Sequence, residues 1–476
     1  MSLLLLLAAP LAGAAVLTRA VGGVARAVNA LTAAVTLAAA AAVVAAVARQ
    51  GSVTALDGLL RADALSAWMA GLVGLIAALA ALEAPRQVPP DEGRRFYPLL
   101  HLFTFTMLLA VTTDDVGLMW VAVEGTTLAS VFLVNFERSR SSLEASYKYL
   151  LICSVGVAIA FAGTVLVYFA DVQQFGDQAY ALRWTTLLRL APGLPAPVIQ
   201  LAFVFLLVGY GTKAGLAPMH TWLPDAHSEA PAPVSALMSG VLLSVGLYAV
   251  LRFKAVVDLA AGPDFAGRLL VALGLASLGV AAAFLWAPRN YKRMLAYSSV
   301  EHVGVVCLGL GFGGPLGVAG AVLHIGNHAL AKSVLFLLSG RIRAAYGTAE
   351  IPAVSGLLRA MPVTGRGFLV AMLALMGLPP FGLFVSEVMI FAAGFQAGYA
   401  PAAALGLALL VVAFSGLLRA AHRMLYGPVT GQVSENPHWA SALPLGVALL
   451  MLVVTGLAWP PGLAGALGQI VSLLAP

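Results

Sequence analysis

Charged residues are scarce in this chain of 476 residues, because Asp, Glu, Lys and Arg together account for only 10% of it. Soluble domains contain about 25% of these residues. Apolar types take their place, at 61% of the chain, and the mean hydropathy is +0.96. This composition excludes an ordinary soluble domain and predicts an integral membrane protein embedded in the lipid bilayer.

Cysteine is nearly absent as well. Cys153 and Cys307 both lie within apolar runs, so we expect neither a disulfide framework nor a Cys-ligated metal site. The sequence contains no motif for nucleotide, flavin, haem or iron–sulfur binding and no nucleophile–base set. The net charge of +6 comes from scattered basic residues without interleaved aromatics, which argues against nucleic acid. We therefore expect no cofactor, no metal ion and no redox catalysis by this chain itself.

Long apolar runs, by contrast, fill almost the whole chain. Windows of about 19 residues predict an all-α polytopic membrane protein with fourteen transmembrane helices and a short amphipathic tail at 462–475. The first run has the length of a signal peptide, but no positive residue precedes its leucines, so it is interpreted as a span. The spans are predicted at 2–18, 28–48, 64–83, 97–113, 116–136, 147–170, 197–219, 232–251, 267–287, 295–312, 316–339, 367–394, 402–421 and 441–459.

Basic residues are distributed unequally between the connections. Of the 26 Lys and Arg residues, seventeen lie in odd-numbered connections and seven in even-numbered ones. Because basic residues stay on the cytoplasmic side, the odd-numbered connections are predicted to be cytoplasmic. Both termini would then lie on the outer side of a prokaryotic plasma membrane. The remaining two, Lys213 and Lys332, fall inside spans.

Titratable side chains inside spans mark candidate functional sites, because a charge at a helix centre costs about 2.5–3.5 kcal/mol. His324, His328 and Lys332 recur every fourth residue, which places them on one helix face. They are interpreted as a proton relay, because imidazole titrates near neutral pH. The simpler alternative is that each histidine only bonds a carbonyl. A metal site is disfavoured, because the same helix offers no carboxylate or thiol at ligand spacing. The other such residues are Glu124, Lys213 and Glu387.

Two of these residues lie beside predicted helix breaks. Lys213 precedes "GLAP", which ends at Pro218, and Glu387 follows "GLPPFG", which contains Pro379 and Pro380. Proline removes a helical hydrogen bond, and irregular backbone at membrane depth is tolerated around a protein-lined or watery cavity. The broken spans, the seventh and the twelfth, are five apart, which predicts inverted repeats of spans 4–8 and 9–13. Prolines that only shape packing are the alternative. The expected units are a three-helix segment at 1–96, repeats at 97–252 and 253–426, and a C-terminal helix with its tail at 427–476.

Further polar residues follow the first break. His220, Asp225, His227 and Glu229 are predicted to lie in a loop, where they are candidates for collecting protons at one membrane face. A solvated loop cap explains them equally well.

Two pairs lie near other predicted helix ends. Glu144 and Lys148 are four residues apart at the start of span six, which favours a helix-stabilising pair. Coupling to a neighbouring subunit is the alternative. Glu301 and His302, near the predicted start of span ten, are further candidates for entry or coupling. The predicted caps of span five are Asp114 and Asp115.

From Leu99 to Tyr426 the chain resembles a known family in the segments "KAGLAPMHTWLPDAHSEAPAPVSALMSG", "YKRMLAYSSVEHVG", "HIGNHALAKSVLFLLSG" and "GLPPFGLFVSE". It is similar to the antiporter-like membrane subunits of the complex I superfamily. These subunits occur in NADH:quinone oxidoreductase, in multi-subunit Mrp-type Na+/H+ antiporters and in group 4 membrane-bound hydrogenases. The segments "WVAVEGTTLASVFLVNF" and "SLEASYKYLLICSVG" most resemble hydrogenase-4 component F, a subunit of formate hydrogenlyase-like complexes.

The resemblance implies a role for each buried group. Glu124 and Lys213 would form an ion pair between spans five and seven, and Glu387 would be the terminal residue on the second broken helix. A proton released from Lys213 is expected to pass through the central relay to Glu387. The expected order within that relay is His328, His324 and Lys332.

Span eight departs from the family pattern. Many relatives carry Lys or His there, whereas this chain has Ser239 and Ser244, so hydroxyls and ordered water would have to bridge the gap. The implied function is a proton-translocating subunit, driven by partner membrane subunits and, through them, by a peripheral redox arm. The alternatives are a Na+/H+ antiporter, acting alone or as an Mrp-type subunit, and a structural subunit whose channel is vestigial.

Overall fold

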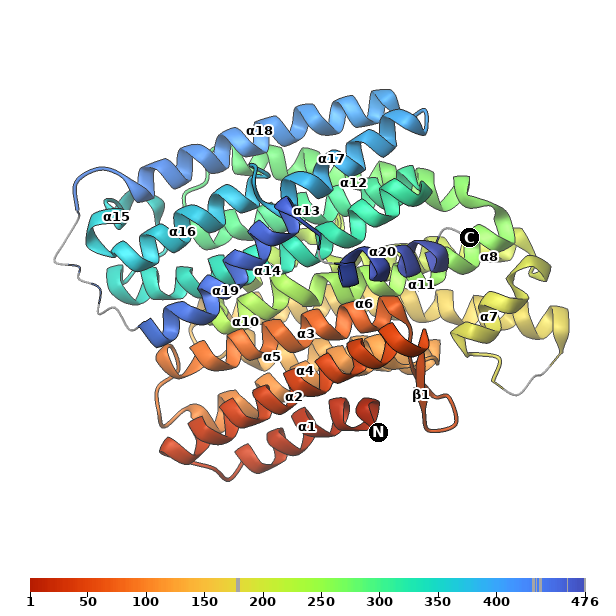
Figure 1. The fold of residues 1–476 in the computed structure, drawn as a ribbon, viewed down its shortest axis with the longest axis horizontal. Helices are drawn as coiled ribbons and strands as arrows, with labels where there is room; N and C mark the ends of the chain where they lie inside the picture. Colours follow the sequence, from red (N-terminus) through yellow and green to blue (C-terminus); the bar gives the residue numbers. More distant parts are fainter. Residues whose placement is uncertain (177–179, 430–432, 434, 436–438, 460, 475–476) are drawn as a thin grey trace.

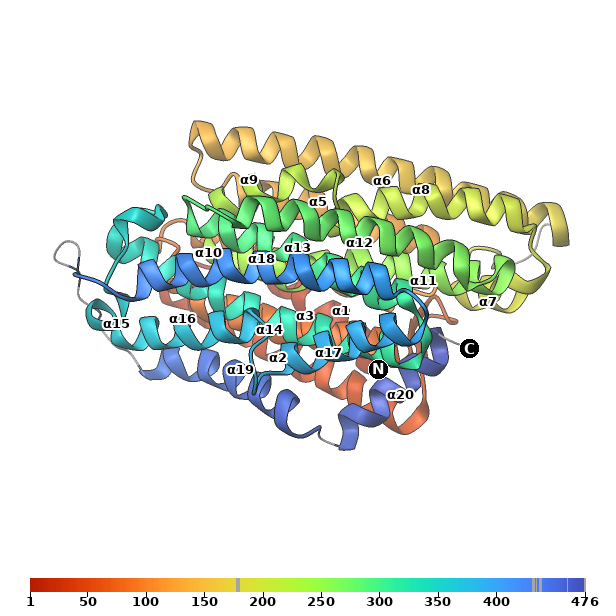
Figure 2. The ribbon, with the colours of Figure 1, turned by 90° about the horizontal axis from the view of Figure 1, so that it is seen from above.

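The computed structural model describes residues 1–176, 180–429, 433, 435, 439–459 and 461–474. Most helices run along the longest axis and pack side by side (Figures 1 and 2). One short antiparallel hairpin, β1 (Val53–Ala55) with β2 (Leu60–Ala62), extends from one end of the bundle. The helices are α1 (Ser2–Leu17), α2 (Gly22–Gln50), α3 (Ala64–Glu83), α4 (Gly93–Thr112), α5 (Val116–Val134), α6 (Arg140–Phe175), α7 (Trp184–Leu190), α8 (Ala196–Ala214), α9 (Trp222–Glu229), α10 (Ala232–Leu237), α11 (Leu243–Ala261), α12 (Pro263–Leu285), α13 (Tyr291–Phe312), α14 (Gly314–Tyr346), α15 (Leu357–Ala360), α16 (Pro362–Leu375), α17 (Gly382–Gln396), α18 (Ala400–Leu425), α19 (Trp439–Leu457) and α20 (Pro461–Leu474).

The predicted all-α membrane fold is confirmed. Within the described residues, eleven helical segments are long and apolar enough to cross a membrane. The other predicted spans fall on shorter or interrupted helices, namely α1, the pair α16 and α17, and α19. All fourteen ranges therefore lie on helices, while the number of crossings stays a prediction. The predicted tail coincides with α20, except for residue 475, which lies outside the described residues.

The helices form a buried centre and an apolar periphery. The apolar windows of α14 and of the segment from α10 to α11 are fully buried, whereas fewer than half of the residues in those of α2, α6 and α18 are buried. Helices α1 and α18 lie at opposite edges in Figure 1, and α6 and α19 do so in Figure 2. Outward side chains such as Leu151 and Val155 are about 60% exposed, as expected of a surface in contact with lipid. Helix α14, with its titratable residues, therefore lies in the middle of the bundle.

The first predicted helix break is present. Helix α8 ends at Ala214, and Gly215 adopts a left-handed conformation with φ of 78°. The chain then passes through a 3₁₀ turn, Met219–Thr221, into α9. The Ala217–Pro218 peptide bond is cis.

The second predicted break is also present. Helix α16 ends at Leu375, Gly377 has φ of 66°, and α17 begins only at Gly382. The Pro379–Pro380 bond is cis. Both interruptions lie where the sequence predicts them, and the division into inverted repeats stays a proposal.

Span eight contains an irregular turn that the sequence does not predict. Between α10 and α11 the chain forms a π-helical turn, Met238–Leu242, which includes Ser239. Such turns are rare and frequently occur at functional sites.

Glycine allows α6 and α8 to approach each other closely. A Cβ at Gly209 of α8 would lie 2.5 Å from the backbone nitrogen of Ala160 on α6. Small residues at helix contacts are the usual means of close packing in membranes. This contact holds α8, and with it Lys213, against α6.

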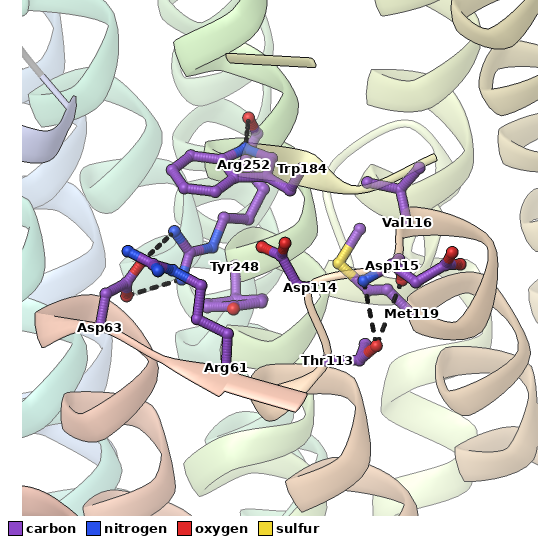
Figure 3. Close-up of a pocket in the computed structure, with 10 residues that line it drawn as sticks. All are labelled: Arg61, Asp63, Thr113, Asp114, Asp115, Val116, Met119, Trp184, Tyr248 and Arg252. Carbon is purple, nitrogen blue, oxygen red and sulfur yellow. Dashed lines mark hydrogen bonds and ion pairs between the residues drawn. The ribbon is translucent and has the colours of Figure 1, made fainter. Parts of the chain in front are cut away.

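A buried ion pair closes the end of the bundle near the hairpin (Figure 3). The Arg252 guanidinium donates to both Asp63 oxygens at 2.7 Å and to the Ser66 hydroxyl at 2.8 Å. It also lies 4.2 Å from the ring centre of Trp184 and 4.8 Å from that of Tyr248. Because α11 continues to Ala261, Arg252 and Lys254 are buried on a helix, and their predicted place in a connection is wrong. The pair ties the start of α3 to α11.

The two predicted caps of α5 differ. Asp115 accepts a hydrogen bond from the Leu118 amide at 2.8 Å and caps the helix as predicted. Asp114 instead accepts from the Thr185 hydroxyl at 2.6 Å, so its predicted capping role is wrong. The backbone bridge between Asp115 and Arg183 holds these neighbouring segments together and directs Asp114 toward α7.

Asp63 titrates under the control of Arg252. Burial raises the pKa of this carboxyl, but the facing Arg252 guanidinium and the Ser66 amide lower it by more, so the pKa lies below its ordinary value of 3.8. A carboxyl whose pKa is lower in the folded than in the unfolded state stabilises the fold at pH values above its unfolded-state pKa. This contribution is lost as the pH falls through its folded-state pKa.

We expect Asp63→Asn to destabilise the purified protein by about 3 kcal/mol, because it leaves the Arg252 charge buried without a counter-ion. Asparagine still caps a helix, so the change isolates the charge. Thermal unfolding in detergent should show an equal loss at about pH 6 and about pH 8, since Asp63 is ionised at both. The exposed hairpin variant Asp57→Asn should change stability by less than about 0.5 kcal/mol. Equal stability of the two variants would contradict the assignment.

Candidate functional site

Lys213 lies at the end of α8, next to the first break, and its side chain is fully buried. Its Nζ donates to the Thr127 hydroxyl on α5 at 2.9 Å and to the Tyr149 hydroxyl on α6 at 2.8 Å. The ammonium also lies 4.8 Å from the centre of the Tyr149 ring. Three helices therefore meet at this lysine, and both of its acceptors are neutral oxygens.

Glu124 contacts this site through an intermediate. The Thr127 hydroxyl, one turn further along α5, donates to its Oε2 at 3.3 Å, and the Ser154 hydroxyl on α6 donates to its Oε1 at 2.6 Å. Among the described residues, no salt bridge joins Glu124 directly to Lys213. The ion pair that the family resemblance implies is therefore relayed by one hydroxyl. A small displacement of α5 would be enough to change the link.

The second buried lysine has a similar environment. The Nζ of Lys332, in the middle of α14, donates to the Leu295 carbonyl at 2.6 Å and to the Ser298 hydroxyl, both on α13. Glu301, one turn beyond Ser298, is buried and interacts electrostatically with Lys332. Its Oε2 has no hydrogen-bond partner within the described ranges. Each buried lysine therefore contacts a hydroxyl residue that lies three residues from a carboxylate residue on the same helix.

Three histidines continue from Lys332. His328 and His324 precede it by one and two turns on α14, as the sequence predicts. His302 of α13 packs against both, with ring centres 5.1 Å apart in each case. Its Nδ1 lies 2.9 Å from the Nε2 of His324. The predicted row of side chains is therefore widened by a histidine from a second helix.

Glu387 of α17 completes the row. One of its oxygens and one ring nitrogen each of His302 and His324 lie within 4.8 Å of one another. The adjacent Ser386 hydroxyl lies 2.9 Å from the Nδ1 of His324. The carboxylate packs against Gly377 in the second break, where an added Cβ would lie 2.2 Å from Oε2. The break therefore makes room for the glutamate.

The order of these groups differs from the sequence prediction. Lys332 was expected between the histidines and Glu387, but the structure places His324 beside α17 and Lys332 at the far end of the row. The i, i+4 spacing fixes the common face, whereas the position of α17 along that face depends on tertiary packing. The observed order is Lys332, His328, His302, His324, Glu387.

The span-eight serines cannot titrate as the Lys or His of many relatives would, but Ser239 contacts the Lys332 site. Its hydroxyl lies 2.7 Å from that of Ser299 on α13. Ser299 donates to the Leu295 carbonyl at 3.0 Å, the same carbonyl that accepts from Lys332. Ser239 is therefore the donor in the serine pair. Ser244, at the start of α11, is also buried.

The predicted surface candidates form a charged network at one end of the bundle. Lys148 lies 2.6 Å from Glu144 and 3.2 Å from Asp225, which in turn lies 2.9 Å from Arg293. Glu229 accepts a hydrogen bond at 2.8 Å from a serine hydroxyl of α6. The predicted helix pair is confirmed, and the network joins α6, α9 and α13. Exposed pairs of this kind contribute about 0–1 kcal/mol each.

The predicted loop after the first break is instead a helix. His227 lies in α9, fully buried, with its ring 4.9 Å from that of Phe336. In the described structure neither of its nitrogens has a hydrogen-bond partner, and it lies within electrostatic range of Lys332. The loop-cap interpretation is therefore wrong for His227. His220 is 7% exposed and lies near the ring of Tyr297.

Glu301 and His302 are not near a helix end. Helix α13 begins at Tyr291, four residues before the predicted span, so both lie almost three turns inside it. Both side chains are buried and face the α14 row. Their predicted place near a helix start is therefore wrong, while their role in entry or coupling stays a prediction.

Sequence reasoning missed the neutral groups that hold the lysines. Thr127, Tyr149 and Ser298 carry no signal of their own, because hydroxyl residues are common in spans and bond many partners. Lys292 was also assigned to a connection. It lies at the start of α13, 1% exposed, and its Nζ donates to the Ser228 and Ala230 carbonyls at the end of α9. The negative end of a helix dipole stabilises such a cation.

The chain matches known proteins over most of its length. Residues 113–413 match the family described as NADH:quinone oxidoreductase/Mrp antiporter, TM. The chain is 39% identical over 374 residues to a hydrogenase-4 component F homolog of Methylacidiphilum infernorum (isolate V4), covering 78% of each chain. It is 33% identical over 371 residues to hydrogenase-4 component B of Escherichia coli (strain K12), covering 74% of this chain and 53% of that protein.

Solved structures share the fold. A chain of the membrane-bound sulfane sulfur reductase, an archaeal respiratory membrane complex, superposes with a TM-score of 0.89 at 24% identity, covering 99% of both chains. A chain of respiratory complex I from Thermus thermophilus with bound aureothin gives 0.80 at 26% identity, covering 96% of this chain and 97% of that one. A chain of the Mrp complex from Dietzia sp. DQ12-45-1b gives 0.85 at 22% identity, covering 100% and 96%. The first and third similarities concern the fold alone.

We expect Thr127→Val to destabilise the protein by about 1–3 kcal/mol, because it deprives Lys213 and Glu124 of a shared hydroxyl without changing the side-chain volume much. Thr127→Ser should restore most of the loss. The measurement is thermal unfolding of the purified chain. Thr126→Val is the matched control, because in the described part of the chain that hydroxyl bonds only the Val123 carbonyl of its own helix. If both valine variants unfolded alike, the hydroxyl link would have no energetic role.

Proposed function

Because the chain belongs to the NADH:quinone oxidoreductase/Mrp antiporter family of membrane subunits, we propose that it is a proton-translocating, antiporter-like subunit of a redox-driven membrane complex. The observation that carries the proposal is the row of buried polar groups at the centre of the bundle. Inside a membrane such groups are costly, and they mark ion and proton pathways. The row extends from Lys332 to Glu387, and the Glu124–Thr127–Lys213 site is a separate buried polar site.

Lys213 is the loading site in this proposal. A carboxylate close to an ammonium favours the protonated lysine, and its withdrawal favours release. Thr127 transmits this influence from Glu124, so a shift of α5 relative to α8 would change it. Since α8 is interrupted directly after Lys213, its end can move without displacing a continuous helix.

The transfer from Lys213 to Lys332 requires more than direct contacts. In the described structure no hydrogen bond joins the Lys213 site to the Ser239–Ser299 pair. Ordered water would complete this step, since buried polar sites commonly hold water that makes about three hydrogen bonds. From Lys332 the proton passes along His328, His302 and His324 to Glu387.

A polar groove offers an entry to the row. It has a volume of about 550 Å³ and is lined by Lys292, Glu137 and Arg343 among others. His227 lies within electrostatic range of both Lys292 and Lys332, so in this proposal it is the intermediate between the groove and the central lysine. On the predicted topology this end of the bundle is cytoplasmic. The exposed Glu144–Lys148 network at the same helix ends would serve coupling rather than entry.

The similarity of the fold to known subunits also supports the proposal that this chain has partner subunits. The solved chains of the same fold belong to multi-subunit membrane complexes, a sulfane sulfur reductase, an Mrp complex and complex I. We place this chain in the plasma membrane of a prokaryote, with both termini on the outer side, next to other membrane subunits that transmit the work of a peripheral redox arm. The division into repeats at 97–252 and 253–426 belongs to the same proposal, and one interrupted span in each half supports it.

We expect Lys213→Ala to reduce proton translocation by about 100-fold, the usual scale for losing a positioned proton-transfer group. Translocation is followed with a pH-sensitive dye in vesicles that contain the assembled complex, and the redox rate is measured in the same vesicles. The exposed Arg268→Ala variant is the control, since its side chain is 74% exposed. Translocation at the wild-type rate in Lys213→Ala, with the complex assembled, would overturn the proposal.

Replacing the serine pair separates a working relay from a vestigial channel. We expect Ser239→Ala combined with Ser299→Ala to slow translocation by about 10-fold, because it removes the hydroxyls next to Lys332. A structural subunit would be indifferent to the change. The control is Ser415→Ala on α18, whose hydroxyl, among the described residues, bonds only a carbonyl of its own helix. Unchanged translocation in the double variant would favour the structural role.

A further inference from the structure

A compact set of three ligands lies at the end of the buried row, contributed by three helices. His302 of α13 and His324 of α14 each offer a ring nitrogen, and Glu387 of α17 offers a carboxylate oxygen, all within 4.8 Å of one another. All three side chains are buried. The glutamate lies on a different helix from both histidines, so spacing along one helix does not reveal it as a ligand. Two imidazoles with one carboxylate form a known zinc ligand set that leaves a fourth position open.

Hydrogen bonds fix the orientation of His324. The Ser386 hydroxyl donates to the Leu383 carbonyl at 2.9 Å, so it has no second proton to give. It therefore accepts from the Nδ1 of His324, 2.9 Å away, and this leaves the Nε2 of His324 with a lone pair. Metal-binding histidines commonly donate their other N–H to such a partner.

His302 cannot satisfy both of its nitrogens when both rings are neutral. If its Nδ1 donates to the Nε2 of His324, 2.9 Å away, its own Nε2 carries a lone pair. That nitrogen meets no partner with hydrogen-bond geometry in the described structure. If Nε2 carries the proton instead, two lone pairs face each other. Either arrangement leaves a nitrogen lone pair without a hydrogen-bond donor, and such a lone pair is able to bind a cation.

The carboxylate is already directed toward the rings. Gly377, in the second break, lies so close to Glu387 that any side chain there would displace it. No salt bridge within the described ranges engages Glu387, so a carboxylate oxygen is available to a cation. In a tetrahedral zinc site the ligand atoms lie about 3.4 Å apart, as bond lengths near 2.1 Å require. The present separations, all within 4.8 Å, therefore need to change by at most about 1.4 Å.

We propose that His302, His324 and Glu387 bind one divalent transition-metal ion of the Zn²⁺ type, and that the bound ion interrupts the buried row. The second half of this statement rests on the proposed function, because the same nitrogens and oxygen would carry the translocated proton to Glu387. Binding itself does not depend on it. Occupation of the site would separate Lys332 from the end of the row.

Co²⁺ serves as the probe, since its visible absorption distinguishes a tetrahedral site from an octahedral aqua ion. The full chain in lipid nanodiscs is stripped with a chelator and titrated with Co²⁺, and Zn²⁺ is then added as a competitor. We expect one Co²⁺ per chain with a tetrahedral spectrum that Zn²⁺ abolishes. Glu387→Gln and His302→Asn should weaken binding by more than about 100-fold, and Ser386→Ala, which removes only a supporting hydrogen bond, by about 10-fold.

His422→Ala is the matched control, because that histidine lies on α18 against Tyr426, away from the row. Its Co²⁺ affinity should equal that of the wild type. X-ray absorption of the wild-type Zn²⁺ form should show two imidazoles and one carboxylate, a result that does not depend on any variant folding. Absence of a tetrahedral spectrum, or equal affinity in Glu387→Gln and His422→Ala, would overturn the site.

Vesicles that contain the assembled complex separate this inference from the proposed function. Zn²⁺ should stop proton translocation in the wild type and in His422→Ala at the concentration that fills the site. Full translocation with the site filled would overturn the interruption. The proposed function fails on a different result, namely wild-type translocation in Lys213→Ala without added metal.

Discussion

The cost of burying an ammonium group in a membrane governs the interior of this bundle. Lys213 and Lys332 are both fully buried, and each donates to two neutral oxygens rather than to a carboxylate. A contact ion pair would hold the charge in place, and removing one partner from such a pair costs about 3–5 kcal/mol. Acceptors without charge hold the lysine while leaving its proton exchangeable. The Asp63–Arg252 pair, closed by two direct hydrogen bonds, shows the opposite design in the same chain.

Helix interruptions supply what such lysines require. Each break lies next to a buried titratable residue, Lys213 at the first and Glu387 at the second. Because the helices end there, backbone groups and glycines approach the charges, and the segments beyond can shift. The π-helical turn at Ser239 adds a third irregular segment at the same central helices. Irregular backbone at membrane depth needs a protein-lined or wet surrounding, and the row of polar side chains provides one.

Much of this organisation could be predicted from the sequence, for identifiable reasons. Hydropathy located the helices, proline and glycine located both breaks, and the i, i+4 spacing placed His324, His328 and Lys332 on one face. The sequence alone does not show which helix faces contact each other. The hydroxyl of Thr127 between Lys213 and Glu124, and the place of His302 beside His324, depend on which faces of distant segments meet. The reversed order of Lys332 and the histidines has the same cause.

The central claim is that the two lysine sites exchange protons through a continuous polar path. A cryo-electron microscopy map of the chain in its native complex, at a resolution that shows ordered water, tests this most directly. The account predicts water density between the Lys213 site and the Ser239–Ser299 pair. Apolar side chains in unbroken contact across that interval, with no water between them, would contradict it.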